Sequence, residues 1–196
     1  MNVDGILAAI IPIVTALEHL GVAYYIGGSV VSSIYGIPRA TFDVDLIADL
    51  RPEQVRPFVK QLEADYYIDE EMIRDAIKHH SSFNVMYLAS MLKVDVFLPK
   101  LRSFDREEYR RAQPETLIQG TRAFYVASPE DTVLHKLEWY RMGNEISDRQ
   151  WNDILGVLKV RGKALDMVYV RQWAVQLGVA DLLERALEDA GLTGSL

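Results

Sequence analysis

Two carboxylates, Asp43 and Asp45, stand one residue apart within the otherwise apolar residues 42–48. The alternation of residue types in this segment predicts a β-strand with one packed face. Both carboxylates then lie on the other face, with their Cα atoms about 6.5–7 Å apart. Carboxylates placed like this repel each other and lose solvation when buried. Divalent cations remove both costs, because carboxylate oxygens are the ligands that Mg²⁺ prefers. The pair therefore predicts a metal site.

A third carboxylate, Asp95, occurs in a second β-prone segment, residues 91–98. Val94 and Val96 flank it, so the Asp95 side chain is expected on the face opposite the packed one. If this strand lies beside the first, three carboxylates share one face, which is a ligand set for two Mg²⁺ ions about 3.5–4 Å apart.

A glycine corner precedes the acidic strand. Residues 22–26 are β-prone, and Gly27, Gly28 and Ser29 follow them. Glycine lets the backbone approach a phosphate closely, and the free N–H groups at the start of a helix bind anions. Taken alone, this segment also fits an ordinary turn from a strand to a helix. Its conjunction with the three carboxylates favours a phosphate site.

Together these residues resemble the DNA polymerase β-type nucleotidyltransferase superfamily. The pattern here is Ile26-Gly27-Gly28-Ser29, a spacer of thirteen residues, Asp43-Val44-Asp45-Leu46, and later Asp95. The spacer residues Arg39 and Thr41, at alternate positions before Asp43, are similar to those of bacterial AbiEii-type proteins, which act as toxins in toxin–antitoxin pairs. A later helical Lys and Asp in that group resemble Lys136 and Asp153.

The resemblance implies a role for each of these residues. Asp43, Asp45 and Asp95 are expected as catalytic residues and metal ligands. The residues expected to bind nucleotide are Gly27, Gly28, Ser29, Arg39, Lys136 and Asp153.

The residues themselves leave some alternatives open. Arg39 either contacts a triphosphate or neutralises the strand carboxylates. Lys136 is either a phosphate ligand or a helical lysine that extends along an apolar surface. Asp153 either joins the site or pairs with Arg149 one helical turn away. Asp148 either joins the site or simply suits the start of a helix, where a carboxylate interacts favourably with the helix dipole.

The expected fold is α+β: a nucleotidyltransferase fold with a short mixed β-sheet flanked by helices, followed by a C-terminal helical bundle. The division is expected at residues 1–127, the catalytic domain, and 128–196, a helical domain packed against it. Apolar spacing and capping patterns predict helices over 5–20, 29–35, 52–64, 70–78, 102–112, from 128, from 147, over 165–177 and over 180–190. Strands are predicted over 22–26, 42–48, 83–88, 91–98, 116–118 and 123–126.

The amino-acid composition limits the classes of partner and compartment that we expect for the protein. The 196 residues are 49% hydrophobic and 25% charged, with a formal net charge of −7, which disfavours broad nucleic-acid coating. The absence of cysteine excludes disulfides and fits the cytoplasm. No apolar run is long enough to span a membrane.

The predicted activity is transfer of a nucleoside monophosphate from an NTP to a hydroxyl of RNA, protein or a small molecule, with release of pyrophosphate. Two Mg²⁺ ions are the expected cofactors, and Mn²⁺ can replace them. A cognate antitoxin is the expected partner if the protein is a toxin. Two alternatives are a catalytically silent member that binds nucleotide or a partner, and an antitoxin-like enzyme that modifies a protein hydroxyl.

Overall fold

The computed structural model describes residues 3–41, 43–117 and 122–192. Within them the chain divides into two compact units. The sheet unit comprises residues 1–27 and 40–126, and the helical unit comprises residues 28–39 and 127–196. The sequence placed residues 28–39 in the first domain, whereas in the structure this segment packs with the later helices.

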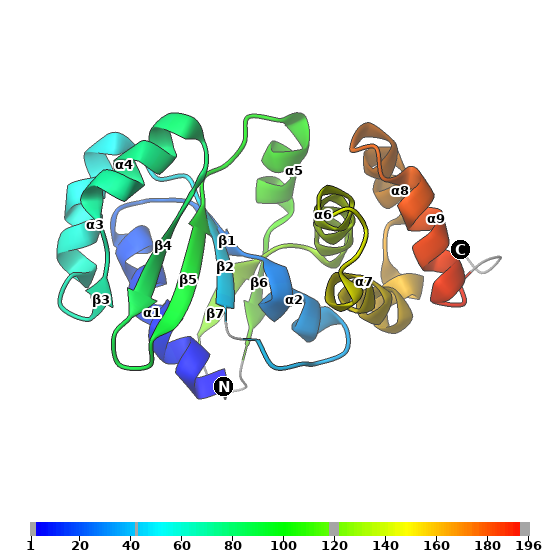
Figure 1. The fold of residues 1–196 in the computed structure, drawn as a ribbon, viewed down its shortest axis with the longest axis horizontal. Helices are drawn as coiled ribbons and strands as arrows, with labels where there is room; N and C mark the ends of the chain where they lie inside the picture. Colours follow the sequence, from blue (N-terminus) through cyan, green and yellow to red (C-terminus); the bar gives the residue numbers. More distant parts are fainter. Residues whose placement is uncertain (1–2, 42, 118–121, 193–196) are drawn as a thin grey trace. The chain divides into compact units, whose positions relative to one another are not determined.

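The sheet unit is built on a seven-stranded sheet with the order β3-β4-β5-β2-β1-β7-β6 (Figure 1). Two pairs, β2 with β5 and β1 with β7, are parallel, and the other pairs are antiparallel. The strands are β1 (Tyr24–Ile26), β2 (Asp43–Ala48), β3 (Tyr66–Tyr67), β4 (Ser82–Tyr87), β5 (Leu92–Phe97), β6 (Gln113–Thr116) and β7 (Ala123–Val126).

Four α-helices belong to this unit: α1 (Val3–His19), α3 (Val55–Leu62), α4 (Glu70–His79) and α5 (Ser103–Arg111). A short 3-10 helix, Pro52–Gln54, precedes α3. Helix α1 packs against β5 and α3, and α3 packs against α4. Every second residue of β2 and β5 is buried, as expected for strands whose apolar face is covered by helices.

The opposite face of the sheet is covered unevenly. Tyr25 of β1 lies opposite Ile47 of β2, and its buried ring contacts Tyr109 of α5 edge-on, with 4.9 Å between the ring centroids. At the other end of β2 the side chain of Asp43 is exposed and that of Asp45 is half-buried. The acidic end of this face therefore remains accessible to solvent.

The helical unit contains α2 (Gly28–Tyr35), α6 (Pro129–Met142), α7 (Asp148–Arg161), α8 (Met167–Gln176) and α9 (Ala180–Asp189). A 3-10 turn, Gly162–Ala164, follows α7. Helix α2 packs on α6 and α7, α9 packs on α7, and α8 packs on α6 (Figure 1). The side chains of Ser128 and Ser147 accept hydrogen bonds from backbone N–H groups in the first turns of α6 and α7, which fixes where both helices begin.

Two strands differ from the sequence prediction. The two-residue strand β3 was not predicted, because two residues carry no measurable periodicity. The first strand of the last hairpin covers Gln113–Thr116 rather than 116–118, and it pairs with β7. Residue 118 lies outside the described residues.

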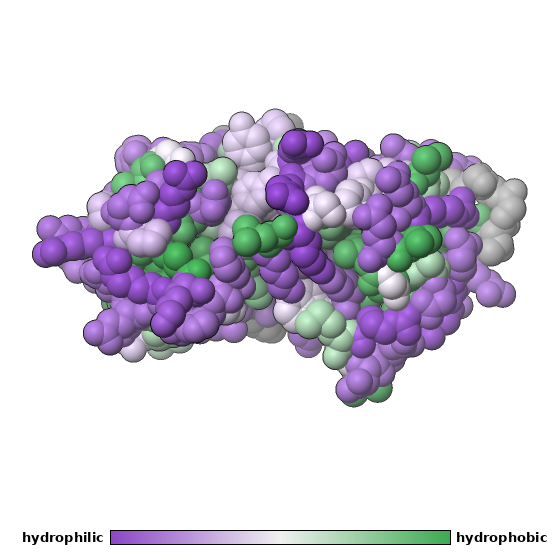
Figure 2. Space-filling view, turned by 90° about the horizontal axis from the view of Figure 1, so that it is seen from above, coloured by the Kyte–Doolittle hydropathy of each residue, from purple (hydrophilic) through white to green (hydrophobic). Residues whose placement is uncertain are grey.

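No helix in the described part of the chain is long and apolar enough to cross a membrane. Hydrophilic residues cover most of the face shown in Figure 2, with separate hydrophobic patches between them.

Candidate functional site

The parallel pairing of β2 with β5 brings the predicted carboxylates together. Asp45 lies opposite Asp95, and Asp43 lies opposite Lys93. Residues directly opposite on neighbouring strands project from the same face and are about 4.8 Å apart. All four side chains therefore occupy one end of the solvent-accessible face.

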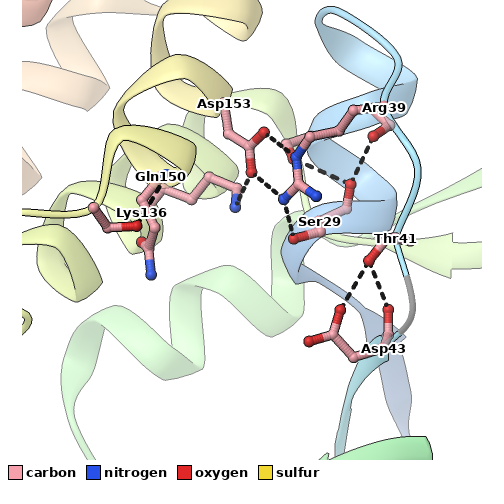
Figure 3. Close-up of polar contacts among 10 residues, drawn as sticks. Ser29, Arg39, Thr41, Asp43, Lys136, Gln150 and Asp153 are labelled. Atoms are coloured by element: carbon pink, nitrogen blue, oxygen red, sulfur yellow. Dashed lines mark hydrogen bonds and ion pairs between the residues drawn. The ribbon is translucent and has the colours of Figure 1, made fainter.

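We call Asp43, Asp45 and Asp95 the carboxylate group. Two further side chains interact with its members. The hydroxyl of Thr41 donates to Asp43 Oδ1 at 2.8 Å (Figure 3). The ammonium of Lys93 lies 2.7 Å from Asp95 Oδ2. The hydrogen bond to Asp95 raises the pKa of Lys93, and the negative charges of Asp95, Asp43 and Asp45 raise it further against the opposing effect of burial. A cation thus already lies within the field of all three carboxylates.

The donor chemistry of this group fits Mg²⁺ or Mn²⁺. It offers only carboxylate oxygens, which are hard ligands that these cations prefer. The ammonium of Lys93 shows that a positive charge is already accommodated beside them. Among the described residues, no three His, Asp or Glu side chains are already gathered in the geometry of a metal site. Asp43 and Asp45 would hold the ions, and Asp95 would complete the ligand set.

The glycine corner joins β1 to α2. The N–H of Gly27 donates to the carbonyl of Asp45 at 2.9 Å, so this glycine continues the pairing of β1 with the acidic strand. Gly28 has a φ of +62°, a backbone conformation that glycine adopts without strain. Ser29 follows in the first turn of α2, and its carbonyl accepts hydrogen bonds from the hydroxyls of Ser32 and Ser33.

A cationic cluster lies within the helical unit and consists of Arg39, Lys136 and Asp153 (Figure 3). Arg39 binds Asp153 in a bidentate manner, with Nε 2.7 Å from Oδ1 and Nη2 2.8 Å from Oδ2. Lys136 Nζ donates to the same Oδ2 at 2.8 Å. Arg39 Nη2 also donates to Ser29 Oγ at 2.6 Å. The cluster contains two cations and one anion, so its formal charge is +1.

Lys136 and Asp153 are buried, whereas Arg39 is partly exposed, with 25% of its side chain accessible. The Lys136 side chain is 9% exposed and that of Asp153 is 5% exposed. Burial by itself would raise the pKa of Asp153, but hydrogen bonds from Arg39 and Lys136, together with their charges, hold that pKa below its ordinary value. Asp153 is therefore an anion that fixes two cations in place.

A close approach of α2 to α7 explains how Arg39 reaches Asp153. A Cβ atom added to Gly36 would lie 2.7 Å from the carbonyl carbon of Gly156 and from the nitrogen of Val157. Asp153 and Gly156 are three residues apart on α7, so they lie on the same face of that helix. The glycine pair therefore lets the chain after α2 pass over α7 and bring Arg39 onto Asp153.

The structure answers part of what the residues left open. Arg39 is bound to Asp153, 114 residues later in the chain, and Lys136 is buried on the same carboxylate. Asp148 is exposed at the start of α7. The alternation of residue types already placed Lys93 on the face of Asp95, two residues away, and Thr41 was expected to be structural. Neither the ion pair of Lys93 with Asp95 nor the hydrogen bond of Thr41 to Asp43 was predicted.

No protein-family model matches the sequence, and no curated protein matches it either. Solved structures do match it. The solution structure of the antibiotic-resistance factor ANT(2'')-Ia has a TM-score of 0.56 and 15% identity over 93% of this chain and 97% of that chain. A crystal structure of ANT(2'')-Ia in complex with adenylyl-2''-tobramycin gives 0.58 and 13%, over 87% and 95%. The chain has the nucleotidyltransferase fold.

A third structure agrees. An antigenic nucleotidyltransferase-like protein from Paracoccidioides brasiliensis has a TM-score of 0.54 and 18% identity, over 92% of this chain and 90% of that chain. The expected α+β nucleotidyltransferase fold is thereby confirmed. At these identities the likeness establishes the fold, while substrates and chemistry depend on the residues of the site.

Proposed function

We propose that the protein is a metal-dependent nucleotidyltransferase that moves a nucleoside monophosphate from an NTP to an acceptor hydroxyl. One observation carries the proposal. On a sheet of nucleotidyltransferase fold, Asp45 and Asp95 lie in register on neighbouring parallel strands, with Asp43 on the same face. Three carboxylates at the accessible end of a strand pair are costly unless cations bind there.

The reaction balances as one displacement at phosphorus. The acceptor oxygen forms a bond to the α-phosphorus, the bond from that phosphorus to the oxygen bridging to the β-phosphate breaks, and pyrophosphate leaves. Asp95 takes the proton of the acceptor hydroxyl. Asp43 and Asp45 would hold two Mg²⁺ ions, which Mn²⁺ could replace, and Asp95 would complete the ligand set of one of them. Bound there, the ions would neutralise phosphate charge and make the acceptor hydroxyl easier to deprotonate.

The nucleotide phosphates are assigned to the glycine corner and the cationic cluster. Gly27 and Gly28 provide close backbone approach, and Ser29 provides a hydroxyl. Arg39 and Lys136 provide positive charge, and Asp153 orients both. A cluster with a formal charge of +1 whose members are already hydrogen-bonded costs little to reorganise when an anion binds.

The acceptor that we favour is a hydroxyl of a small molecule. ANT(2'')-Ia has been crystallised with adenylyl-2''-tobramycin, a small molecule that carries an adenylyl group. The net charge of −7 also disfavours a long polyanionic acceptor. The resemblance to AbiEii-type toxins points instead to RNA as the acceptor and an antitoxin as the partner, so the experiment must distinguish these classes.

The test uses NTPs labelled at the α-phosphate, incubated with the protein, Mg²⁺ and a cell extract. We expect label on a small molecule and release of pyrophosphate. Label on RNA or protein would support the nucleotidyltransferase activity but show that the acceptor is a macromolecule rather than a small molecule. Binding of Mg-NTP in calorimetry without pyrophosphate release would identify a silent member and overturn the proposal.

The control is the double substitution Asp43→Asn and Asp45→Asn. It removes two charges with little change in side-chain size, so we expect turnover to fall at least about a thousandfold while circular dichroism stays unchanged. The matched variant Asp75→Asn changes an exposed carboxylate on α4 and should retain activity. Full activity in the double variant would exclude the assigned chemistry.

A further inference from the structure

Lys93 lies beside Asp43, Asp45 and Asp95 on β2 and β5, but the proposed reaction gives it no role. Its ammonium is 2.7 Å from Asp95 Oδ2, and its side chain is 45% exposed. It lies opposite Asp43, and the charges of Asp43 and Asp45 act on it. A single flexible cation is therefore placed among three carboxylates that are expected to bind metal.

We propose that Lys93 is a tethered counter-ion that exchanges with the divalent cation. Without metal its ammonium binds Asp95 and balances part of the charge of Asp43 and Asp45. When a divalent cation enters, the ammonium leaves Asp95 and moves into solvent. This inference rests on the proposed function, because it concerns the same three carboxylates.

The chemistry of lysine suits this role. Its charge is compact, its four-carbon stem has several rotatable bonds, and its ammonium is strongly hydrated. The half-exposed side chain can therefore release Asp95 without unfolding any part of the strand. Arginine would bind a carboxylate through two nitrogens, as Arg39 binds Asp153, and would be harder to displace.

The exchange has a consequence for the order of binding. A free divalent cation must compete with Lys93 for Asp95, so the protein alone should bind metal weakly. A cation that arrives with a triphosphate brings additional oxygen ligands and is less affected by the competition. Lys93 therefore favours entry of the metal together with its nucleotide over binding of metal alone.

The test measures binding of Mn²⁺ without nucleotide, by the loss of the electron paramagnetic resonance signal of the free ion. Lys93→Met keeps the length of the side chain and removes its charge, and we expect it to bind Mn²⁺ about tenfold more tightly than the unmodified protein. Lys93→Arg keeps the charge and should bind no more tightly than the unmodified protein. Lys100→Met removes an exposed lysine of the same unit and should not change the affinity.

Stability gives a second, independent measurement. Lys93→Met leaves three carboxylates without their neighbouring cation, so its melting temperature without metal should fall, and Mn²⁺ should restore it. If Lys93→Met does not fold, Lys93→Gln replaces it in both measurements. An affinity for Mn²⁺ that is unchanged or lower in the charge-removing variant overturns the inference.

The failure of this inference and that of the proposed function give different results. Turnover of Mg-NTP with unchanged Mn²⁺ affinity in Lys93→Met overturns the exchange and leaves the nucleotidyltransferase assignment in place. Tight Mn²⁺ binding that persists in Asp43→Asn/Asp45→Asn means that the metal binds elsewhere, which overturns both.

Discussion

The carboxylate group and the cationic cluster are built in opposite ways. The carboxylate group of the sheet unit consists of three anions, and one half-exposed cation, Lys93, lies beside it. The cationic cluster of the helical unit has two cations fixed on one buried anion, Asp153. The first group has an excess of negative charge at an accessible strand end, and the second has an excess of positive charge around a buried carboxylate.

This difference determines how each group affects the stability of the fold. A buried carboxylate that satisfies two cations is required by the fold, because its loss leaves charges without partners. Carboxylates that face each other across two strands oppose the fold, because they repel. Removal of one carboxylate should therefore have opposite effects on stability in the two groups.

Asp153→Ala is expected to have the largest effect. It leaves Lys136 and Arg39 without their shared anion, so the free energy of unfolding of the helical unit should fall by about 3–5 kcal/mol. All three tryptophans, Trp139, Trp151 and Trp173, belong to this unit. Tryptophan fluorescence during urea unfolding therefore reports on it directly.

The matched control is Asp148→Ala on the same helix. Asp148 is exposed in the first turn of α7, so its removal should cost at most about 1 kcal/mol through the helix dipole. Equal losses in the two variants would show that Asp153 is an ordinary helical carboxylate.

Gly36→Ala should have the next largest effect. The added Cβ meets backbone atoms of α7 at 2.7 Å, which no side-chain rotation can relieve. Overpacking of this kind costs about 1–3 kcal/mol, and it should also displace Arg39 from Asp153. Urea unfolding measures the first effect, and a raised KM for NTP measures the second.

Gly143→Ala serves as the comparison for that variant. Gly143 has a φ of −83° at the end of α6, and a Cβ there would be 3.4 Å from its nearest neighbour. We therefore expect Gly143→Ala to leave the free energy of unfolding nearly unchanged. If Gly36→Ala is tolerated equally well, the close approach of α2 to α7 does not position Arg39.

The two groups also differ in how far the sequence predicts them. The alternation around Asp43, Asp45 and Asp95 is local, so a strand with its acids on one face could be predicted, although the register that places Asp45 opposite Asp95 depends on strand order. The cationic cluster joins Arg39 to a residue 114 positions later. No local pattern encodes that contact.

The secondary structure shows the same difference between local patterns, which the sequence predicts, and long-range pairing, which it does not. Helices with a capping residue and apolar spacing, such as α6 and α7, could be predicted from their first turn onward. Strand β6 contains Pro114 and almost no apolar side chain, and it exists because its backbone pairs with the edge of β7. Pairing across the sheet is a property of the whole unit, so it was not visible in the segment itself.

The smallest expected effect has the opposite sign to the first two. Asp45→Asn removes one of two like charges that lie directly opposite on β2 and β5. Such pairs are destabilising by about 0.2–1 kcal/mol, so the free energy of unfolding of the metal-free sheet unit should rise by that amount. Seven of the ten tyrosines belong to the sheet unit, and near-ultraviolet circular dichroism in chelator follows its unfolding.

The exposed Asp75 provides the reference for this gain in stability, because Asp75→Asn should change the free energy of unfolding by no more than about 0.5 kcal/mol. Added Mn²⁺ should then reverse the order, since it stabilises the unmodified protein more than Asp45→Asn by binding only to the folded state. A loss of stability in metal-free Asp45→Asn would mean that this carboxylate supports the fold as Asp153 does, and the contrast between the two groups would fail.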